Sequence, residues 1–167
     1  MGQLIRLASP VQFNSLVDGK GIRMVVWCQG CNVHCTGCHN PETQNPCGGK
    51  SVALDDVLNL IEKNALHHDG ITLSGGDPFL QPHQCKIIAD KAHSLGLNVW
   101  AYCGLTFEEL KKDKNKKELL KSCDVLVDGP FIIEQRNVTL PFRGSENQRI
   151  IDVQQSLKKH KVIIWDC

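Results

Sequence analysis

Apolar residues along this chain fall into two alternating patterns, short continuous runs and helical spacing. Short β-branched or apolar runs at residues 22–27, 71–73, 97–103 and 124–128 predict buried strands. Apolar positions 54, 57, 58 and 61, and then 85, 88, 92 and 95, recur as on one face of a helix. Thr106 and Glu109 have the spacing of a capping box, which predicts a helix reaching about Lys121. Residues 162–165 (VIIW) predict a final strand.

This alternation of strands and helices predicts an α/β protein with a largely parallel sheet of about five to six strands. A closed (β/α) barrel of eight units needs about 250 residues, and this chain has 167. We therefore expect any barrel to be incomplete. Because the chain contains no internal repeat or linker-like tract, we also expect residues 1–167 to form a single domain.

Four polar or glycine-containing segments come directly after predicted strands. They are a cysteine-rich segment after residue 27, SGGDP at residues 74–78, YCG at residues 102–104, and DG at residues 128–129. The carboxyl ends of parallel strands lie at one edge of a sheet, where α/β proteins carry their chemistry. The sequence therefore predicts a single active site at that edge.

The charge balance excludes several classes of protein. Lys and Arg total 19 and Asp and Glu total 18, for a net charge of +1, which disfavours a general nucleic-acid binder. The lysine-rich residues 111–121 are interrupted by acidic residues and lack aromatic neighbours, as expected for a solvated helix face. No apolar run approaches the ~18 residues needed to cross a bilayer, and the N-terminus lacks the apolar core of a signal peptide. We expect a cytoplasmic protein that binds neither nucleic acid nor membrane.

Cysteine content is the unusual feature of the composition. There are nine cysteines, at positions 28, 31, 35, 38, 47, 85, 103, 123 and 167. An odd number of cysteines without a secretory signal is a poor basis for a disulfide framework. Four of them lie within eleven residues, which points instead to a metal site.

The spacing of this group, Cys28-x2-Cys31-x3-Cys35-x2-Cys38, is compatible with two kinds of metal site. A structural zinc site in an adaptor protein would use all four thiolates, but its two CxxC pairs normally lie about 15–20 residues apart. Closely spaced thiolates on one loop are more typical of iron–sulfur ligation. Since Cys28 lies inside a strand pattern, we expect it to be a small buried residue and not a ligand.

Without Cys28, the remaining residues form a CxxxCxxC triplet, Cys31, Cys35 and Cys38. Three thiolates on a four-iron cluster leave one iron open, and an open coordination position indicates chemistry, as it does at catalytic zinc sites. The triplet therefore predicts a reactive [4Fe–4S] cluster. We assign no function to Cys47, Cys85, Cys123 or Cys167.

This triplet resembles the common motif of the radical S-adenosylmethionine (SAM) enzymes. DGKGIR at residues 18–23 leading into WCQGC at 27–31 resembles the opening of the glycyl-radical activase branch, and CHNP at 38–41 resembles that branch around its third cysteine. SGGDP resembles the glycine-rich SAM-binding turn. VLVDG at 125–129 and FRGSENQ at 142–148 resemble the activating proteins of anaerobic (class III) ribonucleoside-triphosphate reductase.

The resemblance implies a radical SAM oxidoreductase with two cofactors, a [4Fe–4S] cluster held by Cys31, Cys35 and Cys38, and SAM. One electron from the cluster would cleave SAM to methionine and a 5′-deoxyadenosyl radical, which would take a hydrogen atom from a glycine of the partner enzyme. The implied partner is anaerobic ribonucleoside-triphosphate reductase, or alternatively another glycyl-radical enzyme such as pyruvate formate-lyase. A low-potential donor such as flavodoxin or ferredoxin would supply the electron.

The same resemblance implies where SAM binds. Gly75, Gly76 and Asp77 would accept hydrogen bonds from its ammonium group, Tyr102 and Cys103 would line the ribose or adenine pocket, and Asp128 would orient SAM or a cation. No side chain is expected to be catalytic by itself, because the cofactors carry the chemistry. The polar residues 143, 145, 147 and 148 are expected to shape the partner-binding rim or to contact SAM.

Overall fold

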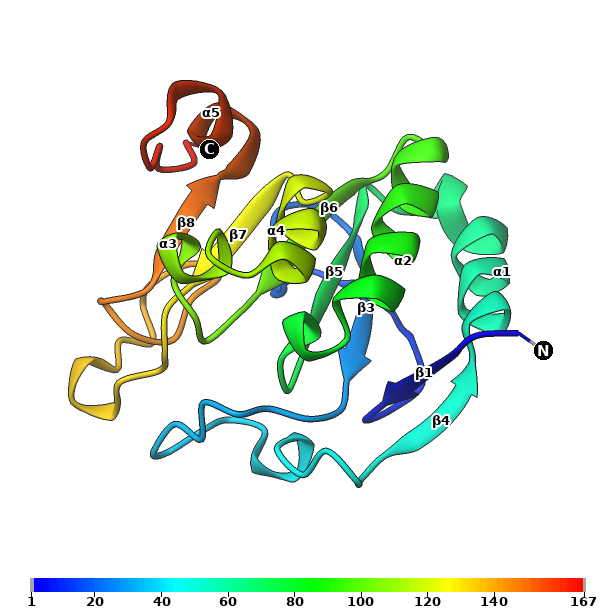
Figure 1. The fold of residues 1–167 in the computed structure, drawn as a ribbon, viewed down its shortest axis with the longest axis horizontal. Helices are drawn as coiled ribbons and strands as arrows, with labels where there is room; N and C mark the ends of the chain where they lie inside the picture. The colour runs from blue at the N-terminus through cyan, green and yellow to red at the C-terminus, as the bar shows by residue number, and fades with distance from the viewer. Residues whose placement is uncertain (1, 167) are drawn as a thin grey trace.

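A computed structural model describes residues 2–166, which form one mixed sheet with helices packed against it (Figure 1). The sheet has eight strands: β1 (Leu4–Leu7), β2 (Gln12–Ser15), β3 (Arg23–Cys28), β4 (Lys50–Ala53), β5 (Gly70–Gly75), β6 (Asn98–Tyr102), β7 (Val125–Asp128) and β8 (Arg149–Asp152). The helices are α1 (Leu54–Asn64), α2 (Pro82–Ser94), α3 (Phe107–Leu110), α4 (Lys114–Lys121) and α5 (Val153–Lys159).

The centre of the sheet is parallel. Strand β3 pairs with β5, β5 with β6, and β6 with β7, all in parallel. These are the four strands that the short apolar runs predict, and most of their residues are buried, as is typical of parallel strands at the centre of an α/β sheet. The α/β class is thus confirmed.

The edges of the sheet are antiparallel, which the sequence did not predict. On one side β1 and β2 pair with β3, and β4 pairs with β1; on the other side β8 pairs with β7. The expectation of five to six strands is therefore wrong in number, because the sheet has eight, and parallel pairing is confined to four of them, β3, β5, β6 and β7. The four unpredicted strands have four residues each and mixed polarity, so they carry little period-two signal.

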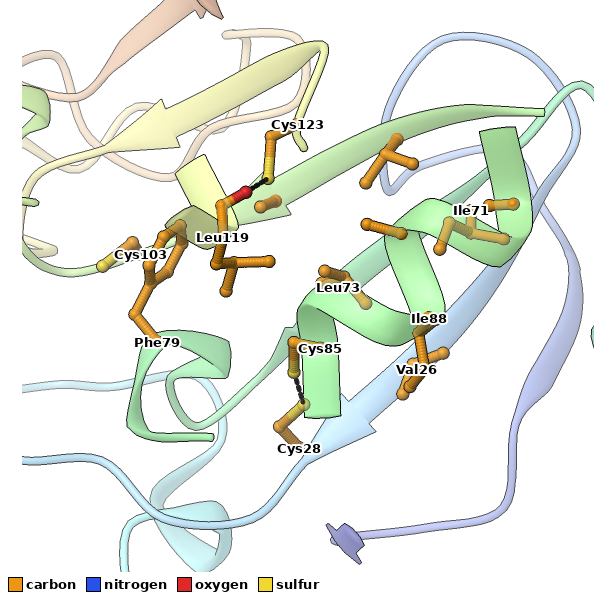
Figure 2. Close-up of a cluster of buried hydrophobic side chains, with 14 of the residues drawn as sticks. Val26, Cys28, Ile71, Leu73, Phe79, Cys85, Ile88, Cys103, Leu119 and Cys123 are labelled. Carbon is orange, nitrogen blue, oxygen red and sulfur yellow. Dashed lines mark hydrogen bonds between the residues drawn. The ribbon is translucent and has the colours of Figure 1, made fainter. Parts of the chain in front are cut away.

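The two faces of the sheet differ in character. Helices α1, α2 and α4 cover one face, and between them lies the main core, to which Val26, Leu73, Ile88 and Leu119 contribute (Figures 1 and 2). On the opposite face, a smaller cluster is formed by Trp100, Val125, Val127 and Ile150. This smaller cluster comes from β6, β7 and β8, whose side chains alternate between the two faces of the sheet.

Arg23 lies on the second face and is completely buried. Its guanidinium donates to the Thr72 hydroxyl at 2.7 Å and to the carbonyl of Lys20 at 2.8 Å, and it lies 5.5 Å from the centre of the Trp100 ring. Burial lowers the pKa of Arg23 to about 10. The face opposite the helices is therefore partly polar, as expected of a surface that encloses a ligand space.

Two further predictions need correction. The capping box of Thr106 and Glu109 is present, but the helix it starts ends at Leu110, and the Asp113 side chain caps a second helix, α4. Residues 162–165 do not form a strand: they contribute only an isolated bridge between Ile164 and Ile151. This segment instead folds back after α5, and its Trp165 ring packs edge-on against Trp100 at 5.0 Å.

No helix within residues 2–166 has the length and apolar character needed to cross a membrane.

Candidate active site

The segments that follow the four parallel strands meet around one cavity of about 150 Å³. Each strand contributes through the loop at its carboxyl end, as the sequence predicts. Its lining includes Cys31, Cys35, Cys38, Gly75, Gly76, Tyr102, Cys103, Gly104, Val127 and Gly129. Seven of the nine predicted site residues therefore surround a single space, and the two that do not are Asp77 and Asp128.

The three cysteines of the triplet are half-buried free thiols that share this cavity. Their loop is held at its base by backbone bonds: the Gly30 N–H donates to the Thr43 carbonyl at 2.7 Å, and the Cys31 N–H donates to the Gln44 carbonyl at 3.0 Å. Partial burial raises the pKa of the Cys31 thiol. Three thiols that face one space from a short loop fit the ligand set of a cluster with one open iron.

Cys28 lies on the other side of the sheet. It is fully buried in the helix-facing core, where its sulfur lies 3.6 Å from the sulfur of Cys85 (Figure 2). The expectation that Cys28 is a small buried residue is confirmed. A zinc site that used Cys28 with the triplet would need this side chain to leave the core, and within residues 2–166 no three His, Cys, Asp or Glu side chains are grouped to hold a single ion.

The SGGDP turn is joined to the start of the cysteine loop by two backbone hydrogen bonds. The Gly76 N–H donates to the Cys28 carbonyl at 2.8 Å, and the Asp77 N–H donates to the Gly30 carbonyl at 2.7 Å. A Cβ atom on Gly76 would lie 2.3 Å from the Gly30 oxygen. Glycine is required here because two backbone segments touch, and this contact sets the position of the turn relative to the thiols.

Asp77 is buried, with a relative exposure of 3%, and its carboxylate faces protein donors. One oxygen accepts the Phe79 N–H at 2.9 Å, and the other accepts the Cys103 thiol proton at 3.4 Å. Burial raises the pKa of Asp77 and also that of Cys103. The structure thus places Asp77 beneath the cavity, where it connects the glycine turn to the end of β6.

Tyr102 marks the boundary between this cavity and a larger one of about 600 Å³. Its hydroxyl donates to the Phe142 carbonyl at 2.7 Å, which fixes the loop between β7 and β8 across the mouth of the site. Burial raises the pKa of Tyr102, so the phenol stays protonated as a donor. Both cavities share the side chains of His39, Asn40, Ser74, Tyr102, Phe131 and Gln148.

The Asp128 carboxylate is buried at the end of β7, and both of its oxygens accept hydrogen bonds from protein donors. It accepts the Phe107 N–H at 2.8 Å and two hydrogen bonds from Arg149. Arg149 also pairs with Glu108 at 2.7 Å, and these two carboxylates raise the pKa of Arg149. Asp128 therefore supports the rim of the site, and its side chain is not part of the lining.

The polar residues of the RGSENQ segment form hydrogen bonds within their own loop. Ser145 and Asn147 are hydrogen-bonded to each other and to the backbone of residues 130 and 132, while the Gln148 side chain accepts the Gly144 N–H at 2.9 Å. Arg143 donates to the Gln148 carbonyl at 2.6 Å. These bonds hold Gln148 at the junction of the two cavities.

Sequence reasoning missed two residues that shape the site. The buried Gln29 amide donates to the carbonyls of Glu42 and Asn45 and so closes the cysteine loop. Arg149 neutralises the buried Asp128 carboxylate. Gln29 lies between two cysteines and Arg149 comes after a polar run, and neither position carries a pattern that distinguishes it from a solvent-exposed residue.

The chain is similar to iron–sulfur and activating proteins of known name. Residues 17–151 match a family described as a 4Fe-4S single cluster domain. The chain is 34% identical over 145 residues to the anaerobic ribonucleoside-triphosphate reductase-activating protein of Haemophilus influenzae, covering 81% of this chain and 90% of the relative. Proteins of the same name from Enterobacteria phage T4 and Escherichia coli K12 are 32% and 31% identical, covering 86% and 80% of this chain and 92% and 90% of their own.

Among solved structures, QueE from Escherichia coli aligns with a TM-score of 0.49 and 16% identity, covering 60% of this chain and 52% of that one. The family match over residues 17–151 spans the cysteine triplet, the glycine turn and the loop that carries Gln148. This chain belongs to the 4Fe-4S single cluster domain family and to the family of anaerobic ribonucleoside-triphosphate reductase-activating proteins.

Proposed function

We propose that this chain is a radical SAM activase that installs a glycyl radical in anaerobic ribonucleoside-triphosphate reductase. The observation that carries the proposal is the single cavity in which Cys31, Cys35 and Cys38 face the SGGDP turn. The names of the relatives favour this reductase over pyruvate formate-lyase as the partner.

In this proposal the three thiolates hold a [4Fe–4S] cluster and leave one iron free of protein ligands. When bound, the cluster and SAM together supply a hydrogen-abstracting radical, and reductive cleavage is within reach because iron–sulfur potentials extend to about −700 mV. The chain contributes position and exclusion of water. The close contact between Gly76 and Gly30 fixes the distance between the glycine turn and the thiols.

The predicted SAM-binding residues take two different roles. Gly75, Gly76, Tyr102 and Cys103 line the cavity and would contact SAM through backbone and side-chain atoms. Asp77 and Asp128 would act as positioning residues, because their carboxylate oxygens are occupied by protein donors.

The larger cavity is the space into which we place the partner's glycine segment. It is lined on one side by Trp27, Tyr102 and Phe142, and it opens beside Leu16 and Val17, whose side chains are 67% and 76% exposed. A peptide backbone needs lateral access that a closed barrel would deny. We therefore interpret the central strands and their helices as an incomplete barrel, in a single domain that comprises residues 1–167.

The electron would come from a low-potential donor protein such as flavodoxin or ferredoxin, and we place the reaction in the cytoplasm. Eight free cysteines among the residues that the structure describes suit a reducing compartment.

The test is an anaerobic assay with the reduced, cluster-loaded chain, SAM and the reductase. We expect release of 5′-deoxyadenosine and methionine, together with a glycyl doublet in the electron paramagnetic resonance spectrum of the reductase. SAM that stays intact would contradict the proposed chemistry. Cleavage of SAM with a doublet only on pyruvate formate-lyase would contradict the proposed partner.

A further inference from the structure

Two buried thiols lie in contact on the helix-facing side of the sheet. The sulfurs of Cys28, at the end of β3, and Cys85, in the first turns of α2, are 3.6 Å apart, and both side chains are completely buried (Figure 2). Among the cysteines that the structure describes, no other two thiols are in contact: Cys103 donates to Asp77, and Cys123 donates to the Leu119 carbonyl.

Both thiols are attached to segments that hold the active site. The Cys28 carbonyl accepts the Gly76 N–H at 2.8 Å, and the backbone of Cys28 is the surface against which Gly75 packs. Cys85 lies one helical turn after Gln81, whose amide donates to the Gln29 and Arg6 carbonyls at the base of the cysteine loop. A change in the distance between the two sulfurs therefore acts on both the glycine turn and the cysteine loop.

We propose that Cys28 and Cys85 form a reversible oxidation site, in which a peroxide converts the two thiols to a disulfide that displaces the SGGDP turn. The peroxide O–O bond breaks as one thiol becomes a sulfenic acid with release of water. The second thiol then attacks the sulfenic sulfur, forms the S–S bond and releases a second water. Two thiols are oxidised by two electrons, and one peroxide is reduced to two waters.

The displacement follows from bond length. An S–S bond is about 2.05 Å long, so the sulfurs must approach from 3.6 Å. Strand β3 is held in register with β5 through residues 23–28, whereas Cys85 lies near the start of a helix. Closure moves Cys28, α2 or both. A shift of Cys28 acts on the hydrogen bond from the Gly76 N–H to its carbonyl, and a shift of α2 acts on the Gln81 hydrogen bonds at the base of the cysteine loop.

The environment also sets the order of reaction. The hydrogen bond with the Cys28 thiol, together with burial, raises the pKa of Cys85, which keeps it protonated and slow to react in the closed protein. The exposed Cys47 is therefore oxidised before the buried pair. The pair reacts when α2 opens locally, and the disulfide that results is enclosed in the core and protected from further oxidation.

Peptide mapping of the full chain, freed of iron with a chelator and then treated with hydrogen peroxide, tests this directly. Trypsin cleavage after Lys and Arg leaves Cys85 as the only cysteine in residues 64–86, and Cys28 with the triplet and Cys47 in residues 24–50. We expect these two peptides to become linked, with a mass loss of about 2 Da, and to separate again with dithiothreitol. Fragmentation of the linked peptide should place the bond at Cys28.

Two substitutions provide the controls. The link should disappear in Cys28→Ala and persist in Cys123→Ala, which removes another fully buried thiol from the same core. Hydrogen exchange at residues 74–77 should be faster in the disulfide form than in the reduced form. A Cys85 thiol that stays free once Cys47 is oxidised would overturn the proposal, and so would a link that survives in Cys28→Ala or exchange at 74–77 that does not change. These measurements need neither cluster nor SAM, so their outcome is independent of the proposed activase function.

Discussion

Arg149 and Asp128 lie directly opposite each other on β8 and β7 and are joined by two hydrogen bonds, one of them 3.0 Å long from Nε to Oδ1. Asp128 is buried and Arg149 is about one-third exposed. This ion pair fixes the antiparallel edge strand to the parallel centre of the sheet, next to the loop that carries Gln148. The position of the cavity rim therefore depends on an ion pair that no sequence motif predicts.

Replacing Arg149 with Met should destabilise the fold, because it leaves the Asp128 carboxylate buried without its cationic partner. Loss of one member of a fully buried pair costs about 3–5 kcal/mol. Because Arg149 is partly exposed, we expect a loss at the lower end, about 3 kcal/mol. Urea denaturation measures this change in the free energy of unfolding. The matched control is Glu108→Gln, which removes only the exposed partner and should cost less than about 1 kcal/mol. Equal losses in the two variants would contradict the assignment.

Replacing Tyr102 with Phe removes the donor to the Phe142 carbonyl and keeps the ring. Leaving that carbonyl without its partner should lower the free energy of unfolding by about 1–2 kcal/mol. Hydrogen exchange should increase in residues 131–148, the loop that this bond holds over the site. Thr139→Ala, in an exposed part of the same loop, should change stability by less than about 0.5 kcal/mol. Unchanged exchange in Tyr102→Phe would show that the hydroxyl does not fix the loop.

Replacing Gly76 with Ala should separate the glycine turn from the cysteine loop. The added Cβ would lie 2.3 Å from the Gly30 oxygen. Because this oxygen belongs to the backbone, it cannot move away as the end of a flexible side chain can. We expect a loss of about 3 kcal/mol and reduced iron incorporation. At Gly96, which has a positive φ but open space, Ala should cost only about 1 kcal/mol, with normal iron content. Similar iron content in both variants would contradict the structural role of the Gly76 contact.

The buried Asp77 makes stability depend on pH. Because its pKa is raised above the ordinary value of 3.8, the folded protein binds a proton more tightly than the unfolded chain does. The contribution of Asp77 is thus most favourable at acidic pH and is lost as the pH rises from about 4 through the raised pKa. The free energy of unfolding should therefore depend on pH in this range. Asp77→Asn should remove the part of this dependence that Asp77 causes, while keeping the acceptor for the Phe79 N–H. A slope identical to that of the parent protein between pH 4 and 7 would contradict the pKa shift.

The central strands and the site were predictable for the same reason. Buried parallel strands appear as continuous apolar runs, as in Met24–Val26 and Val125–Val127, and the segments after them must meet at one edge. The cysteine triplet and the glycine turn therefore came together as expected. The short edge strands were not predictable, because a sequence such as QFNS in β2 has no distinctive period.

Side-chain direction was the other unpredictable feature. The sequence places Asp77 and Asp128 after strands but does not say which way their carboxylates point. Asp77 turns inward because the Phe79 N–H and the Cys103 thiol are available to it, and Asp128 turns toward Arg149, more than twenty residues away. Residues 162–165 have a strand-like composition, but they pair with β8 only through the bridge between Ile164 and Ile151. Their Trp165 instead packs against Trp100.

Iron and sulfide content across a set of cysteine variants tests the three-thiol cluster most directly. After anaerobic assembly, the parent chain and Cys28→Ala should each hold about four iron and four sulfide ions. Alanine at position 31, 35 or 38 should bring both contents close to zero while circular dichroism shows the fold intact. A cluster lost in Cys28→Ala but kept in one of the triplet variants, or one zinc ion without sulfide in the parent chain, would contradict the account.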